Sequence, residues 1–374
     1  MIRELQLKPD FGRTIDRFEA WWNCQVLDRP PVTLRVAAPA RAAMPPSRAQ
    51  PAMLRDRWMD VQYVVDTAIE AISSRVYPGD SLPIFWSNLG PEITATLFGC
   101  PLEFGPDTSW SSPVVHHQNE WRRIIDSPPD FSNIYWQTIE AMMRYALDIC
   151  DQRFVVGMTD LHGNYDILAA LRDPQALCED ILDAPELVRQ AGRHVSHGFA
   201  AAFKRQYAII RQAGFGSTCW TPSYHQGPAY VPSCDFWCMV SDEVADNMIL
   251  PDILVEMQPL ERSIFHLDGP QALRHLDLLL ELPNLHAIQW VFGAGHGPAS
   301  AWMDVYRRIR SAGKAVQILA ENPDDALAVL AAIGPRGVWL DVGGPEFPSL
   351  AAADSFLLEV QRQTLTHEVK GHTK

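Results

Sequence analysis

The chain has 374 residues, of which 47% are hydrophobic, and its formal net charge is −14. This length and apolar content suffice for a large buried core, and the negative charge argues against binding to nucleic acid or to an anionic membrane surface. No uninterrupted apolar run is as long as a membrane span, and the first residues lack the apolar core of a signal peptide, so we expect a cytoplasmic protein. Seven scattered cysteines without a CxxC pair predict neither a disulfide framework nor a zinc-finger site.

A strand-like apolar run, a turn and an amphipathic helix recur six times from residue 150 onward. These runs begin near residues 154, 216, 263, 287, 315 and 337, and two earlier runs begin near 31 and 81. Asp173-Pro174 and Ala184-Pro185 are favourable helix starts, because proline suits the first turn of a helix. Short strands that alternate with helices predict parallel pairing with helical crossovers, and eight strands is the number that closes a barrel.

We therefore predict an α/β fold, a (β/α)8 TIM barrel with an N-terminal extension and elaborated loops, in which residues 1–374 form a single domain. The alternative is an open doubly wound sheet, which usually carries a glycine-rich phosphate loop after its first strand, and the chain has none. Residues 37–52 are rich in proline and alanine and are expected to border the barrel mouth, and residues 99–131 are expected to form an elaborated loop.

Polar pairs at the ends of apolar strands mark the candidate site, because the active sites of such barrels lie at the carboxyl ends of the strands. His266 and Asp268 in FHLDG are two residues apart and share one face of a strand, as do Asp160 and His162 in MTDLHG. A structural role remains open for both pairs, since a strand-end aspartate often caps the next helix and a histidine often bonds a backbone carbonyl.

Further candidates lie at other strand ends and in the long loop WTPSYHQGPAYVPSCDFWCM. Asp341 is added to the two pairs as a catalytic candidate, and Glu321 joins His266 and Asp268 as a metal-ligand candidate. The predicted substrate-binding residues are Trp220, Tyr224, His225, Tyr230, Asp235, Gln289, Trp86 and Asn88. The run DLHGNYD is close to a cobalamin-binding D-x-H-x-x-G motif, but Tyr165 occupies the glycine position, which argues against that role.

Three segments together resemble the uroporphyrinogen-decarboxylase-like superfamily, and in particular its uncharacterised bacterial branch. They are WSNLGPEITATLFGCPLEFGPDTSW, TDLHGNYDILAALRDPQALCEDILDAPELV and FHLDGPQALRHLDLLLELPNLHAIQWVFGAG, and the likeness spans roughly residues 80–345. The superfamily carries two chemistries on one barrel. Its tetrapyrrole decarboxylases have an amino-terminal RQAGR-type signature, whereas here only Arg35 lies near the first strand, which argues against that activity.

The second chemistry is zinc-dependent methyl transfer between a corrinoid and a thiol. In those enzymes a His-x-Cys pair and a later cysteine bind zinc; this chain matches the histidine with His266 but has Asp268 at the first cysteine and Gly343-Gly344 at the second. The resemblance thus implies a harder nitrogen and oxygen site, in which His266 and Asp268 and one or two of Asp160, His162, Glu321 or Asp341 hold zinc or another divalent metal. It also implies a corrinoid as methyl carrier on a partner protein, and a homodimer, which the 10% aromatic content also favours.

Three functions are kept open. The first is a one-carbon (methyl) group transferase or demethylase that acts on a small molecule at the carboxyl face of the barrel. The second is a decarboxylase or other lyase that acts on a small carboxylated substrate, with Asp268 or Asp341 as acid or base. The third is a non-catalytic ligand-binding barrel.

Overall fold

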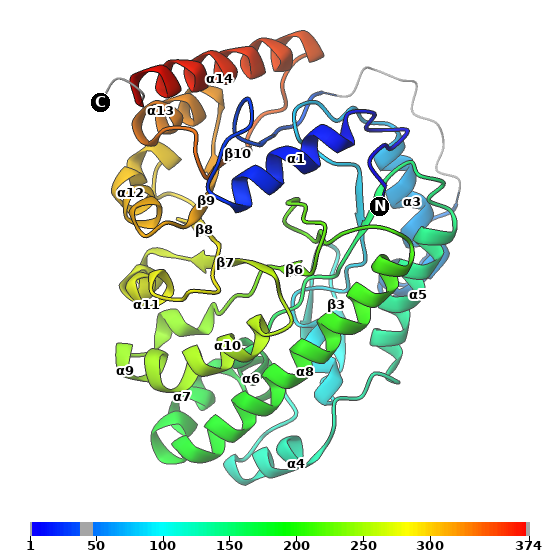
Figure 1. Ribbon diagram of the computed structural model, residues 1–374. Helices are drawn as coiled ribbons and strands as arrows, with labels where there is room; N and C mark the ends of the chain where they lie inside the picture. Colours follow the sequence, from blue (N-terminus) through cyan, green and yellow to red (C-terminus); the bar gives the residue numbers. More distant parts are fainter. Residues whose placement is uncertain (1, 38–47, 372–374) are drawn as a thin grey trace.

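The computed structural model describes residues 2–37 and 48–371, and Figure 1 shows their arrangement. Most of the proline-rich loop expected at the barrel mouth, residues 38–47, lies outside the described residues. Seven of the eight predicted strands occur at the predicted positions: β1 (Val32–Thr33), β2 (Ile84–Trp86), β5 (Val155–Gly157), β7 (Arg262–Asp268), β8 (Ala287–Val291), β9 (Ala315–Ala320) and β10 (Val338–Val342).

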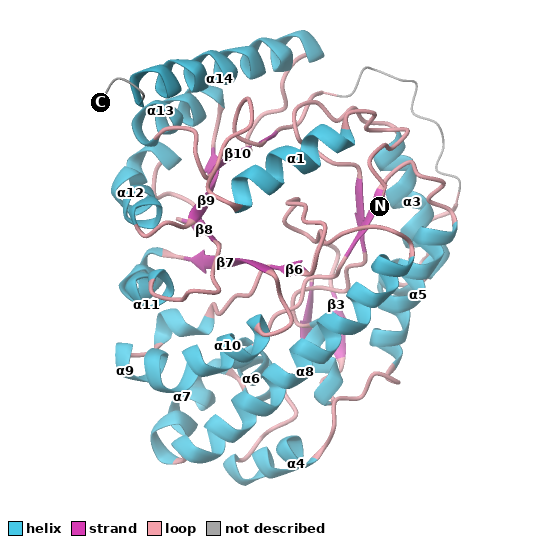
Figure 2. Ribbon diagram, in the orientation of Figure 1, coloured by secondary structure: helices cyan, strands magenta, loops and turns pink. Residues whose placement is uncertain are grey.

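The strands form one parallel sheet of six and a parallel pair beside it. The six-stranded sheet has the order β1-β10-β9-β8-β7-β6, in which β6 (Ala229–Tyr230) was not predicted, and β2 pairs with β5. Figure 2 shows the strands in an arc with helices outside it. A short antiparallel hairpin, β3 (Leu102–Phe104) and β4 (Ser109–Ser111), lies in the elaborated loop region. The predicted α/β fold is confirmed, whereas the sheet is a curled half-barrel and a closed eight-stranded ladder is not seen in the described residues.

The strand predicted at residues 216–220 does not form, which leaves β5 unpaired with β6 and interrupts the arc of strands there. Its backbone makes a single ladder-like bond to the strand before it, from Met158 N–H to the carbonyl of Thr218 at 2.9 Å. The amide of Gly216 is taken by the hydroxyl of Tyr224 at 2.7 Å, and Ser217 pairs back on His225 in an antiparallel bridge. These groups are therefore not available for a regular parallel ladder.

Helices cover the outside of the arc. Proline opens two of them as predicted, α7 and α8, so the expected long helical stretch is two helices. The helices are α1 (Phe11–Trp22), α2 (Leu54–Met59), α3 (Val61–Ser73), α4 (Trp121–Asp126), α5 (Ile134–Asp148), α6 (Asn164–Arg172), α7 (Pro174–Asp183), α8 (Pro185–Gln212), α9 (Asp242–Val244), α10 (Leu250–Met257), α11 (Leu276–Leu280), α12 (Met303–Ser311), α13 (Pro323–Ile333) and α14 (Leu350–Gly371). Shorter 3₁₀ or π turns are η1 (Ile93–Phe98), η2 (Gln118–Glu120), η3 (Phe236–Met239), η4 (Ala245–Ile249), η5 (Pro270–His275) and η6 (Ala299–Trp302). No helix within the described ranges is long and apolar enough to cross a membrane.

The N-terminal extension is helix α1, which covers the amino-terminal ends of the strands (Figure 1). The indole N–H of Trp21 donates to the carbonyl of Val316 near the start of β9, at 3.3 Å. Phe18 packs edge-on against Trp339 of β10, with ring centroids 5.3 Å apart. Helix α1 therefore covers this end of the sheet with buried aromatic rings.

Candidate active site

His266 and Asp268 lie at the carboxyl end of β7 and face Asp235. One ligand atom from each of these three side chains lies within 4.8 Å of the others. Asp235 is brought there because the loop after β6 runs along β7: the amide of His266 donates to the carbonyl of Pro232 at 3.0 Å, and Ser233 bridges to His266 in parallel. The indole of Trp220 stands edge-on to the imidazole of His266, with centroids 5.4 Å apart.

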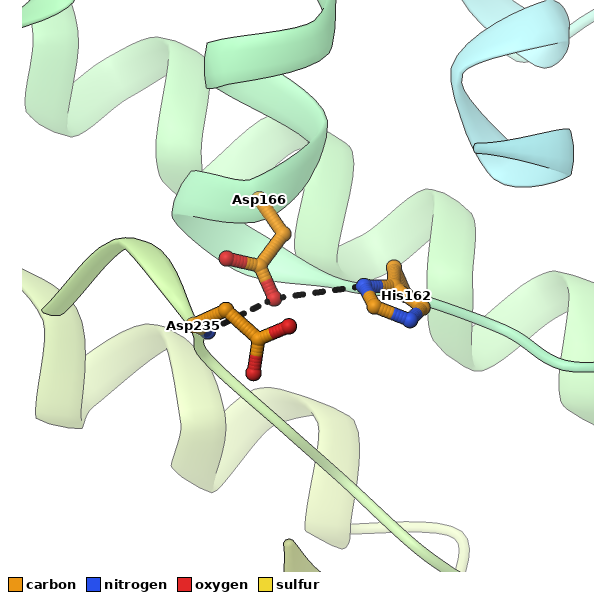
Figure 3. Close-up of side chains that lie close together, drawn as sticks. All are labelled: His162, Asp166 and Asp235. Atoms are coloured by element: carbon orange, nitrogen blue, oxygen red, sulfur yellow. Dashed lines mark hydrogen bonds and ion pairs between the residues drawn. The ribbon is translucent and has the colours of Figure 1, made fainter. Parts of the chain in front are cut away.

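A second group shares Asp235 and includes His162 and Asp166 (Figure 3). Both oxygens of Asp166 accept backbone N–H groups, from Asp235 at 3.0 Å and from Phe236 at 2.9 Å, so Asp166 fixes the loop that carries Asp235. The imidazole of His162 lies between two carboxylates, with Nδ1 3.5 Å from Asp166 and Nε2 3.7 Å from Asp160. Asp166 was not predicted, although its position four residues after His162, on the first turn of α6, is a signal that places both side chains together.

The pKa values of His162 and Asp235 are shifted because several charged groups lie close together in a buried region. Burial opposes a charge on His162, but hydrogen bonds to Asp160 and Asp166 outweigh it and raise the pKa of His162 well above its ordinary value. Burial, followed by the nearby charge of Asp166, raises the pKa of Asp235 to about 6. The histidine therefore favours its charged form here, and Asp235 is less acidic than an exposed aspartate.

Glu256, on α10, positions the turn between His162 and Asp166, and sequence alone gave no sign of it. Its fully buried carboxyl group accepts from the amide of Asn164 at 2.6 Å, from the Asn164 side chain at 3.0 Å and from the Ser196 hydroxyl at 3.0 Å. The side-chain nitrogen Nδ2 of Asn164 also donates to the carbonyl of Ser233 at 2.8 Å, so this side chain links the His162 turn to the Asp235 loop. Burial raises the pKa of Glu256 to about 8, against the effect of these hydrogen bonds.

A line of inward-facing side chains connects His266 to the other side of the sheet. His266, Gln289 and Gln317 are paired in register on β7, β8 and β9. His266 Nδ1 contacts Gln289 Oε1; Gln289 Nε2 donates to Gln317 Oε1 at 2.9 Å; and Gln317 Nε2 donates to Asp341 at 2.9 Å. The Thr33 hydroxyl donates to the other oxygen of Asp341 at 2.7 Å.

The hydrogen bonds along this line all run in the same direction, from the His266 side chain to Asp341 as donors relate to acceptors. Both oxygens of Asp341 accept, so each glutamine presents its N–H₂ toward Asp341 and its oxygen toward His266. His266 must then donate from Nδ1, which leaves a lone pair on Nε2, the form of histidine that binds a metal. Burial raises the pKa of Asp341 above its ordinary value, against the hydrogen bonds of Thr33 and Gln317.

Two cavities open beside these groups. The larger, of about 540 Å³, has Trp220 and Asp341 in its wall, and its further polar lining includes Thr33, Arg35, Arg75, Tyr77, Glu321 and Glu346. The smaller, of about 370 Å³, is lined by His162, Asp166 and Asp235, and also by Glu92, Thr94, Phe236 and Met239. Trp220 contacts His266 from the larger cavity and Asp235 approaches His266 from the smaller one, so His266 lies between the two.

Three predicted substrate-binding residues of the long loop, Tyr224, His225 and Tyr230, make contacts within the protein. Tyr224 and His225 lie toward the amino ends of the strands: the ring of Tyr224 packs on Phe11, and His225 is 2.9 Å from Glu19 of α1. The chain must return to that end because β6 pairs with the start of β7, at Ala229 and Arg262. Tyr230 is fully buried, and its hydroxyl accepts from Leu161 N–H and donates to the Thr159 carbonyl, both at 2.6 Å.

Three other predicted residues also lie apart from the two ligand groups. Trp86 faces a shallow hollow against α3, and the side chain of Asn88 accepts from the amide of Gly90 at 2.7 Å to close a turn. Glu321 lines the larger cavity but belongs to neither group of converging ligand atoms among the described residues. The letters RQAGR do occur, at residues 189–193, but within α8, where Arg193 pairs with Asp252 at 3.0 Å and lines neither cavity.

The fold and these groups define a curled parallel α/β sheet whose polar residues converge at the carboxyl ends of its strands. A solved structure of a methyltransferase from Methanosarcina mazei has this fold: the TM-score is 0.55 over 94% of this chain and 98% of that one, with 9% sequence identity. At this sequence identity the likeness shows a shared fold. A B12-independent methionine synthase from Shewanella sp. W3-18-1 matches at a TM-score of 0.35 and 10% identity, over 86% and 87% of the two chains, which is too low to bear on the site. No protein-family model and no curated protein matches the sequence.

Proposed function

We propose that the protein is an enzyme of one-carbon chemistry, a methyltransferase or demethylase that acts on a small molecule with a divalent metal ion held by Asp235, His266 and Asp268. The observation that carries this proposal is the convergence of these three side chains at the carboxyl end of β7, beside Trp220 and the larger cavity. At 9% identity the likeness to a solved methyltransferase bears on the fold, so the proposal rests on the ligand set.

The donor atoms fit a divalent ion of intermediate hardness. Two carboxylates and one imidazole suit manganese, iron or zinc. The oxygen Oδ1 of Asp235 is buried without a hydrogen-bond partner, and a bound cation would satisfy it. Neither group of converging ligands in the described part of the chain includes a cysteine. Burial raises the pKa of Cys219 to about 12 and that of Cys234 well above its ordinary value, so both remain neutral thiols.

The bound ion would supply a Lewis acid that polarises a substrate oxygen or activates a nucleophile. The residues of the chain orient the reaction around it. Gln289 holds the His266 ring and its tautomer, and Trp220 presents an apolar wall next to that ring. Asp341 fixes the direction of the glutamine line from the far side of the sheet. Arg35 and Arg75 line the larger cavity, so we propose a substrate that carries an acidic group.

The alternative, a decarboxylase or lyase, is favoured by one observation. The larger cavity combines Arg35 and Arg75, which suit a carboxylate, with Asp341, a buried carboxyl group whose pKa is raised. Such a carboxyl group keeps its proton to a higher pH than an exposed aspartate, which suits it to act as a proton donor. In that mechanism the metal site would not be needed for turnover.

A corrinoid protein as methyl carrier and a homodimeric assembly remain part of the methyl-transfer proposal. The corrinoid partner follows from the resemblance noted in the sequence. Such a partner or a second copy would cover exposed apolar side chains. Among them are Trp110 on β4, which is 47% exposed, and Leu182 on α7, which is 80% exposed.

The test follows a labelled methyl group. The protein is stripped with a chelator, reloaded with Mn²⁺ or Zn²⁺, and incubated with a panel of small acids that carry a ¹³C-methyl group on oxygen, nitrogen or sulfur, with a thiol and free cob(I)alamin as acceptors. We expect the ¹³C resonance to move to an acceptor only in the metal-loaded protein. His266→Ala and Asp268→Ala should each abolish the transfer, whereas His197→Ala, on the exposed face of α8, should leave it unchanged.

Two results would decide against the proposal. Release of labelled carbon dioxide by the chelated protein from the same acids with ¹³C in the carboxyl group instead, lost in Asp341→Asn, would establish the lyase. Binding of a panel compound without turnover, unaffected by His266→Ala, would indicate the non-catalytic barrel. Circular dichroism of each variant separates loss of function from loss of fold.

A further inference from the structure

We propose that the protein binds a second divalent cation through His162, Asp166 and Asp235, and that Asp235 bridges this ion and the one at His266 and Asp268. The inference rests on the proposed function for the first ion only. The second site draws its ligands from a different part of the chain, the turn after β5 and the start of α6.

Two separate ions, rather than one, follow from the distances. Ligand atoms of His162, Asp166 and Asp235 all lie within 4.8 Å of one another, and so do those of Asp235, His266 and Asp268. In the described part of the chain the two groups do not merge into a larger one, so a single ion does not reach all five side chains. Asp235 belongs to both groups, and a carboxylate has two oxygens, which allows each to bind a different ion.

The charges of the region also favour a second cation. Asp160, Asp166, Asp235 and Asp268 bring four carboxylates to the two histidines, and they lie together at the end of a largely buried sheet. A dication bound by Asp235, His266 and Asp268 alone would leave Asp160 and Asp166 with His162 as their only cationic neighbour among the residues of the two groups. Oδ1 of Asp235 is buried and makes no hydrogen bond in the described structure, whereas Asp166 is already anchored by two backbone amides.

His162 is presented to the second site in the way that metal-binding histidines are. Figure 3 shows Asp166 on the Nδ1 side of the ring, with Asp235 next to Asp166. Asp160 lies on the Nε2 side, 3.7 Å away, where it can hold the other ring nitrogen. A carboxylate on the second nitrogen of a ligating histidine fixes the orientation of the ring and increases its basicity. Asp160 is therefore assigned a positioning role.

The second site is accessible and rigidly supported. His162, Asp166 and Asp235 line the 370 Å³ cavity, so an ion there meets any molecule that enters it. Asn164 bonds both Glu256 and the carbonyl of Ser233, which sets the distance between the turn and the loop that carry the three ligands. A site whose ligands are held by buried contacts loses little entropy when the ion binds.

Metal content measured on the whole protein tests the proposal. The chain is treated with chelator, dialysed against Mn²⁺ and assayed by mass spectrometry for manganese, and its electron paramagnetic resonance spectrum is recorded. We expect about two Mn²⁺ per chain and an exchange-coupled spectrum, because one carboxylate links the ions. His162→Ala and His266→Ala should each retain about one ion with an uncoupled six-line spectrum, and Asp235→Ala should lose both ions.

The variants separate failure of this inference from failure of the proposed function. One Mn²⁺ per chain in the wild type, unchanged by His162→Ala, would overturn the second site and leave the first intact. Loss of an ion in His162→Ala but not in His266→Ala would support the second site and contradict the first. His197→Ala, an exposed histidine on α8, should bind as many ions as the wild type. If His162→Ala melts early, His162→Gln, which keeps the volume, repeats the measurement.

Discussion

Gly163 is the residue whose replacement most directly probes the packing beneath the site. An alanine there would place its Cβ 2.0 Å from Oε1 and 2.4 Å from Cδ of Glu256, where an ordinary contact begins at 3.4 Å. Glu256 is fully buried and bonded to Asn164, so it cannot swing away into solvent. Either α10 or the turn between His162 and Asn164 must shift by about 1.4 Å.

The cost of Gly163→Ala can be worked from these contacts. Overpacking of a buried site costs about 1–3 kcal/mol, and weakening the hydrogen bond from Asn164 N–H to Glu256 adds about 1 kcal/mol. We therefore expect the free energy of unfolding to fall by about 2–4 kcal/mol. For a chain of this length the unfolding entropy is about 0.8 kcal/mol per degree, which converts the loss to a decrease in Tm of about 3–5 °C.

Differential scanning calorimetry at neutral pH measures this decrease. Gly343→Ala is the matched control, because a Cβ there meets nothing closer than 3.6 Å and its Tm should stay near that of the wild type. In the double variant Gly163→Ala, Glu256→Ala the steric conflict is removed, so its loss should be smaller than the sum of the two single losses. A Gly163→Ala protein that melts within 1 °C of the wild type would refute the reasoning.

Three further predictions concern stability and metal affinity. Glu256 keeps its proton to about pH 8 in the folded protein and to about pH 4 when unfolded. Its contribution to the free energy of unfolding is therefore complete below about pH 4 and is lost as the pH rises toward about 8. Glu256→Gln should flatten this decline in a pH series of Tm values, and an unchanged slope would contradict the prediction. Gln289→Leu removes the acceptor of His266 and should weaken Mn²⁺ binding by about 10- to 100-fold in calorimetric titration, whereas equal affinity would exclude an orienting role. Asp80→Ala leaves the buried Arg29 unpaired and should cost about 3–5 kcal/mol in denaturant unfolding, with a loss under 1 kcal/mol as the contrary result.

The strand positions were predictable because each strand is a short apolar run bounded by turn residues. AVQILA became β9 and GVWLDV contains β10, since β-branched and aromatic residues favour a buried parallel strand. The run GSTCW has the same appearance, yet it forms no strand, because Tyr224 and His225 bind its backbone from a later part of the chain. These competing groups lie eight residues further along the same loop, and the pattern of the run itself gives no sign of them.

The site was predictable where it depends on strand period and not where it depends on loop paths. The two-residue spacing placed His266 and Asp268 on one face, and Gln289 was predicted from its strand as a substrate-binding residue, whereas its register with His266 is seen only in the structure. Asp235 was predicted only as a substrate-binding residue, because its approach to His266 depends on how the loop after β6 runs along β7. Glu256 lies on a helix with an ordinary amphipathic pattern, and only its buried contact with Asn164 shows its role.

The central claim, that Asp235, His266 and Asp268 hold a divalent metal, is tested most directly by anomalous diffraction from crystals of the whole protein soaked in Mn²⁺. Data collected near the manganese absorption edge locate the ion without reference to any assay of activity. The account predicts an anomalous peak within coordination distance, about 2.0–2.4 Å, of side-chain atoms of all three residues. Crystals that bind Mn²⁺ elsewhere, with no peak beside His266 at saturating concentration, would contradict it.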